Sequence, residues 1–168
     1  MAQLPSMWRE ELWHPLVVHF PVALLIVGSA GFALAMALRR KTSAAWLLPA
    51  SRALLVLGTL SAWVAVYTGI LADREVGRDL CDPLVLHAHE RYAYLVCFLF
   101  TGGILADLLG VRFLPSKQWK AWGPRLALVV FLAGTITLGY VGHLGGKLVY
   151  QQAAGVHQPS EDCSEFVK

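Results

Sequence analysis

Four long apolar segments dominate this chain of 168 residues, at residues 16–38, 53–72, 84–110 and 126–146. Each has about 20 residues or slightly more, which is the helix length needed to cross a hydrocarbon core of about 30 Å. Charged residues make up only 15% of the chain, whereas soluble domains carry about 25%. The sequence therefore predicts an all-α membrane protein, a four-transmembrane-helix bundle that forms one integral membrane domain over residues 1–168.

Basic residues predict how this bundle is oriented. They gather after the first segment and between the third and fourth segments, as Arg39, Arg40, Lys41, Arg112, Lys117, Lys120 and Arg125. Acidic residues gather on the other side, before the first segment, at residues 73–82 and near the C-terminus. Because Lys and Arg are enriched on the cytoplasmic side of a membrane, both termini and the 73–82 loop are expected to face outward.

Two internal similarities predict a helix hairpin that occurs twice. Residues 15–20 (PLVVHF) reappear as residues 83–88 (PLVLHA), and residues 52–71 align without a gap on residues 125–144. The expected repeats cover about residues 13–75 and 81–148, and residues 149–168 form an outer tail. If the repeats are parallel, an axis along the membrane normal relates them. His19 and His87 would then face each other across that axis.

Five of the six histidines lie near the outer ends of the predicted helices: His14, His19, His87, His89 and His143. The interval between His89 and Asp107 equals the interval between Arg125 and His143. With a rise of about 1.5 Å per residue, His89 and His143 are therefore expected at one level. His19 and His87 are expected within about 3 Å of it. Ionisable groups inside a membrane usually mark a functional site.

The helical faces leave the choice among these histidines open. His19 and His87 are the first candidates because they match in the repeated string. However, His89 shares a face with Asp107, and a charged residue in a span points into the bundle. His89 therefore has the better-supported inward face, and it forms with His14 and His143 a second set of candidate ligands. Asp107 itself is expected to pair with Arg52 or Arg125.

Paired imidazoles on facing helices of a bundle are typical of b-type haem proteins. The sequence predicts one haem b, or two, and Arg91, Lys147 and Arg74 near the outer mouth would bind propionates or anchor the interface. A zinc, copper or iron ion on the same histidines is an alternative, since imidazole suits all three metals. In a further interpretation, the histidines only satisfy one another, carbonyls or water. The chain would then be a structural subunit of a membrane redox complex.

The cysteines predict a disulfide and no covalent haem. Cys81 and Cys163 both fall on the expected outer side, where an oxidising compartment would allow them to pair. Cys97 lies in mid-span, where a packing role is expected. The three cysteines are isolated, so no cytochrome c attachment motif is present. The chain also lacks a phosphate-binding loop, a Ser/His/Asp arrangement and a nucleic-acid-binding signature.

Residues 13–24 (WHPLVVHFPVAL), 87–92 (HAHERY) and 142–146 (GHLGG) resemble the hallmark of the family called domain of unknown function 2231. The resemblance covers nearly all of the chain. It implies a multi-pass protein of the bacterial inner membrane, often near or fused to cytochrome c-like modules. The expected role is an electron-transfer or binding subunit rather than a stand-alone enzyme. The expected partners are lipid, a cytochrome c-like protein or a quinone, and further copies or a larger complex.

Overall fold

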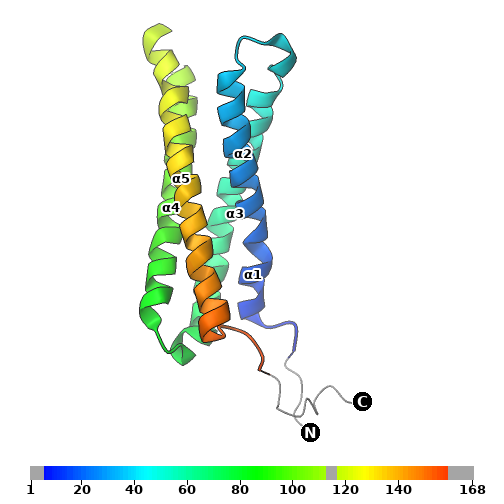
Figure 1. The fold of residues 1–168 in the computed structure, drawn as a ribbon, viewed down its shortest axis with the longest axis vertical. Coiled ribbons are helices and arrows are strands. Elements are labelled where there is room, and N and C mark those ends of the chain that lie inside the picture. Colours follow the sequence, from blue (N-terminus) through cyan, green and yellow to red (C-terminus); the bar gives the residue numbers. More distant parts are fainter. Residues whose placement is uncertain (1–5, 113–116, 159–168) are drawn as a thin grey trace.

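Long helices running side by side form the structure, which is a computed structural model that describes residues 6–112 and 117–158 (Figure 1). No β-strand occurs in these two ranges. Four helical stretches are long and apolar enough to cross a membrane: Glu10–Ala37, Thr42–Asp79, Pro83–Gly110 and Trp122–Gln152. The predicted all-α fold with four spans is confirmed.

The first span is built from the short helix η1 (Glu10–Leu12), α1 (Trp13–Val17) and α2 (His19–Ala37). The second combines η2 (Thr42–Ala44), α3 (Leu47–Val76) and η3 (Gly77–Asp79). The third and fourth are α4 (Pro83–Arg112) and α5 (Lys117–Gln152). The end of the bundle at which α1 and α4 begin and α3 and α5 end is called the histidine end below (Figure 1).

A proline accounts for the break between α1 and α2. Pro21 has no backbone N–H, so it cannot bond the carbonyl one turn earlier, on Val17. The helix is interrupted at Val18, although the backbone N–H of Val18 still bonds the His14 carbonyl at 3.0 Å. The backbone of Val18 keeps right-handed helical angles (φ −60°, ψ −22°), so α1, which carries His14, runs on into α2 with one hydrogen bond missing.

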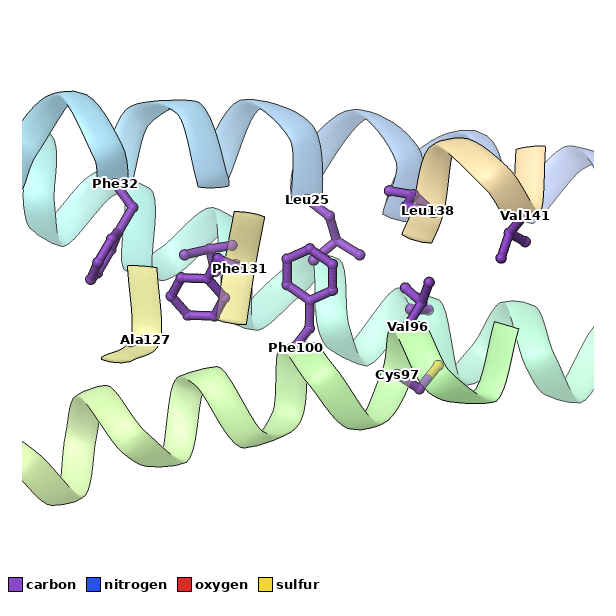
Figure 2. Packing of buried hydrophobic residues seen from close by; sticks show 11 residues of the cluster. Leu25, Phe32, Val96, Cys97, Phe100, Ala127, Phe131, Leu138 and Val141 are labelled. Atoms are coloured by element: carbon purple, nitrogen blue, oxygen red, sulfur yellow. The ribbon is translucent and has the colours of Figure 1, made fainter. Parts of the chain in front are cut away.

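Two helical hairpins make up the bundle, because α2 packs mainly on α3 and α4 mainly on α5. Figure 2 shows the core where the hairpins meet, with Leu25 and Phe32 from α2 opposite Phe100 and Phe131 from α4 and α5. The Phe131 ring stacks on Phe100, with 5.8 Å between centroids, and meets Phe32 edge-on at 5.2 Å. Aromatic packing therefore joins the hairpins at mid-membrane.

Both hairpins use the same packing device, in which a large side chain of each helix lies over a glycine of its partner. In the first hairpin, a Cβ on Gly28 would lie 3.0 Å from the Leu55 side chain, and one on Gly58 would lie 2.8 Å from Leu25. Four other residues make the corresponding contacts in the second hairpin. A Cβ on Gly103 would lie 2.5 Å from Phe131, and one on Gly134 would lie 2.8 Å from Phe100.

These matching contacts give a register that differs from that of the repeated strings. Leu25 and Gly28 correspond to Phe100 and Gly103, and Leu55 and Gly58 correspond to Phe131 and Gly134. Their positions in the sequence differ by 75 in the first case and by 76 in the second. The expected offsets were 68 for the PLVVHF string and 73 for the 52–71 segment. In the observed register, His14 rather than His19 corresponds to a histidine of the second hairpin, which is His89.

Polar contacts also join the hairpins away from the histidine end. Arg52 on α3 donates two hydrogen bonds to the Asp107 carboxylate on α4, from Nε to Oδ2 at 2.6 Å and from Nη2 to Oδ1 at 2.9 Å. This confirms the expected charge pair and selects Arg52 over Arg125 as the partner. Nearer the middle, the Trp63 indole N–H donates to the Thr101 hydroxyl at 3.2 Å.

Candidate functional site

His14 projects from α1 onto α3, where its ring is half-buried. Its Nδ1 lies 3.0 Å from the carbonyl oxygen of Ala65. The Thr68 hydroxyl lies 3.4 Å from the same nitrogen and itself donates to the Ala65 carbonyl at 3.0 Å. Helix α3 therefore orients this imidazole from within the first hairpin.

His89 has the same arrangement in the second hairpin. Its half-buried ring projects from α4 onto α5, where Nδ1 lies 3.1 Å from the carbonyl oxygen of Val141. The offsets agree with those of the packing contacts, since the positions of His14 and His89 differ by 75 and those of Ala65 and Val141 by 76. The two hairpins thus each hold one histidine in an equivalent way.

The two imidazoles meet where the hairpins face each other. Their ring centroids are 6.2 Å apart, and their planes are nearly perpendicular at 89°. His14 comes from the first hairpin and His89 from the second, so half of the site is supplied by each. This pairing makes the His14–His89 contact the candidate functional site.

The carbonyl partners determine which ring nitrogen is available. A carbonyl oxygen only accepts hydrogen bonds, so in each neutral imidazole the proton lies on Nδ1. Nε2 then carries the lone pair in both His14 and His89. Metal-binding histidines usually have this arrangement, with the non-ligating ring N–H donating to a carbonyl or carboxylate.

The number of side-chain donors limits which ligand the site could hold. Within the ranges that the structure describes, no group of three or more His, Cys, Asp or Glu side chains is placed to hold a metal ion. A structural zinc site takes four protein ligands and a catalytic one usually three. His14 and His89 therefore supply two imidazole donors, fewer than a zinc site made of protein ligands takes.

The other candidate ligands are not brought to this pair. His19, His87 and His143 are all exposed on the outside of the bundle. The expected facing of His19 and His87 is thus not the arrangement found, because His19 lies five residues, or about 140° of helix, beyond His14. His87 lies two residues before His89, which turns it about 160° away from the inward face.

The three candidate cations lie at the same end of the bundle but differ in their surroundings. Arg91 is exposed, and its guanidinium carbon lies 5.9 Å from the centroid of the Tyr92 ring. Tyr92 in turn meets Tyr140 edge-on, with 4.9 Å between centroids. Arg74 is exposed and Lys147 is half-buried. Arg91 therefore has an aromatic support, but it lies two residues after His89 and so points about 160° away from the inward face.

The expected disulfide involves a residue outside the described ranges. Cys81 is exposed in the connection before α4, and its expected partner Cys163 lies beyond residue 158. Cys97 is buried in the core beside Val96 and Phe100, as expected for a packing role (Figure 2).

Comparison with known proteins agrees with the architecture. Residues 12–158 match the family described as predicted membrane protein (DUF2231). The chain belongs to the DUF2231 family. No curated protein and no solved structure matches the chain. Membership in DUF2231 thus supports a multi-pass membrane protein, and the chemistry of the site rests on the geometry of this chain.

His14 and His89 stand in the second set of candidate ligands because the PLVVHF string sets a different register from the interhelical contacts. A signal for the right register is present, since the dipeptide Gly58-Thr59 recurs as Gly134-Thr135 at an offset of 76. Both threonine hydroxyls donate to the carbonyl one turn earlier, at 2.7 and 2.8 Å. The PLVVHF string is a longer match and indicates a different offset.

Proposed function

We propose that this protein binds b-type haem between His14 and His89 and transfers electrons near one face of the membrane. The observation that carries the proposal is the pair of imidazoles whose Nδ1 atoms both bond backbone carbonyls, at 3.0 and 3.1 Å. This arrangement leaves Nε2 as the ligating nitrogen of each ring, on two imidazoles whose centroids lie 6.2 Å apart. It has the orienting contacts that a metal-binding histidine needs.

The number of donors favours haem over a bare ion. In a b-type haem the porphyrin supplies four nitrogen ligands, and the protein adds axial ligands such as histidine. Two histidines complete such an iron, whereas zinc would require one or two further protein ligands. The pair formed by His14 and His89 therefore fits the axial positions of a six-coordinate haem iron.

The separation between the two imidazole rings also suits a metal bound by both of them. Two imidazoles bound to one metal through bonds of about 2.0 Å place their ring centroids about 6 Å apart. The observed separation between His14 and His89 is 6.2 Å. Bound haem would supply one-electron exchange between ferric and ferrous iron, and the carbonyls of Ala65 and Val141 would keep both Nε2 atoms free to bind it.

The basic residues and the position of the histidine pair support a location for the site and candidate partners. The histidine end lies opposite the arginine- and lysine-rich connection at residues 39–41, so the positive-inside rule favours the outer face for it. The proposed location is a bacterial inner membrane. Arg91, Lys147 and Arg74 are the candidate propionate partners, and Arg91 lies four residues after His87, on the same outward face. The electron donor or acceptor would be a cytochrome c-like protein or a quinone, reached by this chain alone or within a larger complex.

A bare metal ion is the second candidate. The two imidazoles could share one copper, zinc or iron ion, because imidazole is a good ligand for all three metals. Such an ion would need water or another small molecule to complete its coordination. Metal analysis distinguishes this case from haem.

The test is to purify the protein from cells grown with ample haem and to record absorption spectra of oxidised and dithionite-reduced samples, with metal analysis of the same material. We expect a sharp reduced α-band that is lost in His14→Ala and in His89→Ala. The matched controls are His19→Ala and His87→Ala, whose exposed rings should leave the band unchanged.

Each other outcome rejects part of the proposal. Loss of the band only in the two control variants would overturn the assignment of His14 and His89. A colourless protein with stoichiometric copper, zinc or non-haem iron would replace haem by the bare ion. A colourless protein free of metal would overturn both candidates and leave the histidines as a structural contact.

A further inference from the structure

Each imidazole of the pair lies beside a glycine one helical turn beyond its carbonyl partner. His14 bonds the Ala65 carbonyl and lies against Gly69. His89 bonds the Val141 carbonyl and lies against Gly145. The same four-residue interval therefore occurs in both hairpins.

Helix geometry explains why the two features occur together. The carbonyl of residue i in an α-helix points along the axis toward residue i+4, whose N–H it accepts. A ring that bonds this carbonyl from the side must lie over the Cα of residue i+4. Any side chain at that position would therefore compete with the ring for space.

The distances show how little space a methyl group would have. A Cβ on Gly69 would lie 3.2 Å from Cε1, 3.3 Å from Nδ1 and 3.8 Å from Nε2 of His14. A Cβ on Gly145 would lie 3.3 Å from Cε1 and 3.7 Å from Nδ1 of His89. In His14 the nitrogen that bonds the carbonyl is one of the crowded atoms, whereas in His89 that nitrogen would lie at an ordinary contact distance.

We propose that Gly69 and Gly145 are positioning residues that hold the two imidazoles in the orientation needed for ligand binding. This inference rests on the proposed function for the identity of the ligand. An alanine at either position displaces the ring, lengthens its Nδ1–H···O bond and turns the Nε2 lone pair away from the shared ligand. The effect is larger at Gly69, where three ring atoms rather than two lie within 4 Å.

The control is Gly142→Ala. Gly142 is the residue that pairs with Gly69 when residues 52–71 are aligned on residues 125–144, and it lies on the same helix as Gly145. A Cβ there would have no other atom within 4 Å. Alanine also favours helix more than glycine does, so Gly142→Ala should not weaken the fold.

The experiment is a titration of detergent-solubilised, haem-free protein with hemin. We expect Gly69→Ala to raise the hemin dissociation constant about 10- to 100-fold, the usual effect of losing a contact that orients a ligand. Gly145→Ala should have a smaller effect in the same direction, and Gly142→Ala should bind like the wild type. Electron paramagnetic resonance of the ferric form should show altered g-values for Gly69→Ala, because the His14 ring has turned.

A second measurement separates this inference from the proposed function. Nitrogen-15 NMR of ring-labelled histidine in the haem-free protein reports which nitrogen of His14 carries the proton. We expect an Nδ1–H tautomer in the wild type and in Gly142→Ala, and a mixture of tautomers in Gly69→Ala.

If the wild type binds no hemin but Gly69→Ala still alters the tautomer of His14, the haem proposal fails and the positioning role stands. If Gly69→Ala and Gly145→Ala match Gly142→Ala in both hemin affinity and tautomer, the positioning role is overturned, whatever the wild type binds.

Discussion

His14 and His89 belong to different hairpins, yet their ring centroids lie 6.2 Å apart. Each ring is oriented by a carbonyl of its own hairpin, on Ala65 or on Val141. A ligand bound by both rings would therefore tie the two hairpins together at the histidine end. Its binding should be measurable as added stability of the whole bundle.

We predict that hemin raises the unfolding temperature of haem-free protein. A ligand that binds only the folded state, at about 100 times its dissociation constant, stabilises that state by about 2.7 kcal/mol. The shift should disappear in His14→Ala and persist in His19→Ala, as measured by circular dichroism in detergent. An equal shift in His14→Ala would mean that hemin binds elsewhere.

Replacing Arg52 with leucine should destabilise the bundle by about 3–5 kcal/mol, because it leaves the Asp107 carboxylate buried without a partner. The Asp107 side chain is only 3% exposed, whereas that of Arg52 is 32% exposed. Asp107→Leu should therefore cost less than Arg52→Leu, and the double variant should recover part of the loss. Unfolding by SDS from mixed micelles measures the three free energies.

Arg125→Leu is the matched control for the ion pair. Arg125 is exposed and lies over the Trp122 ring, with 5.5 Å from the guanidinium carbon to the ring centroid. Such an exposed cation–π contact contributes about 0.5–1 kcal/mol. If Arg125→Leu and Arg52→Leu lower the free energy of unfolding equally, the buried ion pair stabilises the bundle no more than an exposed contact does.

Two adjacent glycines on α4 provide a direct test of the packing between α4 and α5. An alanine at Gly103 would place its Cβ 2.5 Å from the Phe131 ring, and overpacking of this kind costs about 1–3 kcal/mol. An alanine at Gly102 would contact nothing within 4 Å, and it should be neutral or stabilising by up to about 1 kcal/mol. Thermal unfolding of both variants should give shifts of opposite sign or clearly different size.

The hydrogen bond from Trp63 to Thr101 should appear as a coupling between α3 and α4. Double-mutant cycles on hydrogen bonds within a membrane protein average about 0.6 kcal/mol, with a maximum of about 1.7. We expect a coupling in this range for Trp63→Phe and Thr101→Val, measured by unfolding of the two single variants and the double variant. Additive single effects would show that the 3.2 Å contact contributes nothing net.

The accessibility of the Cys81 thiol to labelling reports the orientation of the bundle in the membrane. Its thiol is exposed at the histidine end, whereas that of Cys97 is buried. In a Cys163→Ser variant, a membrane-impermeant maleimide should label Cys81 in intact spheroplasts. Labelling only after lysis would place the histidine end in the cytoplasm. A variant with both Cys81→Ser and Cys163→Ser should remain unlabelled, since only Cys97 is left.

Some features of the site were predictable because they depend on the period of a single helix. Asp107 was expected to point inward, and it is 2% exposed in the structure. His89 lies about five full helical turns before Asp107 on α4, so the two side chains share a face. The inward face of His89 therefore follows from the cost of exposing a carboxylate to lipid.

The pairing of His14 with His89 was not predictable in the same way. It depends on how α1 lies against α3 and on how the two hairpins face each other, and the period of a single helix reports neither. The repeat could have supplied the match, but the PLVVHF string indicates an offset of 68 rather than 75. A short run of matching letters is weaker evidence of equivalence than the spacing of interhelical contacts.

The sequence by itself determined the four membrane spans and the end of the bundle at which the histidines gather. Lipid provides no hydrogen-bond partners, so apolar segments of this length must form complete helices whatever their neighbours are. Only the tertiary structure decided which histidines meet, because that depends on how Leu25, Leu55, Phe100 and Phe131 lie over glycines of the partner helices. Those contacts set the rotation of each helix, and the rotation turns His14 and His89 toward each other and His19 and His87 outward.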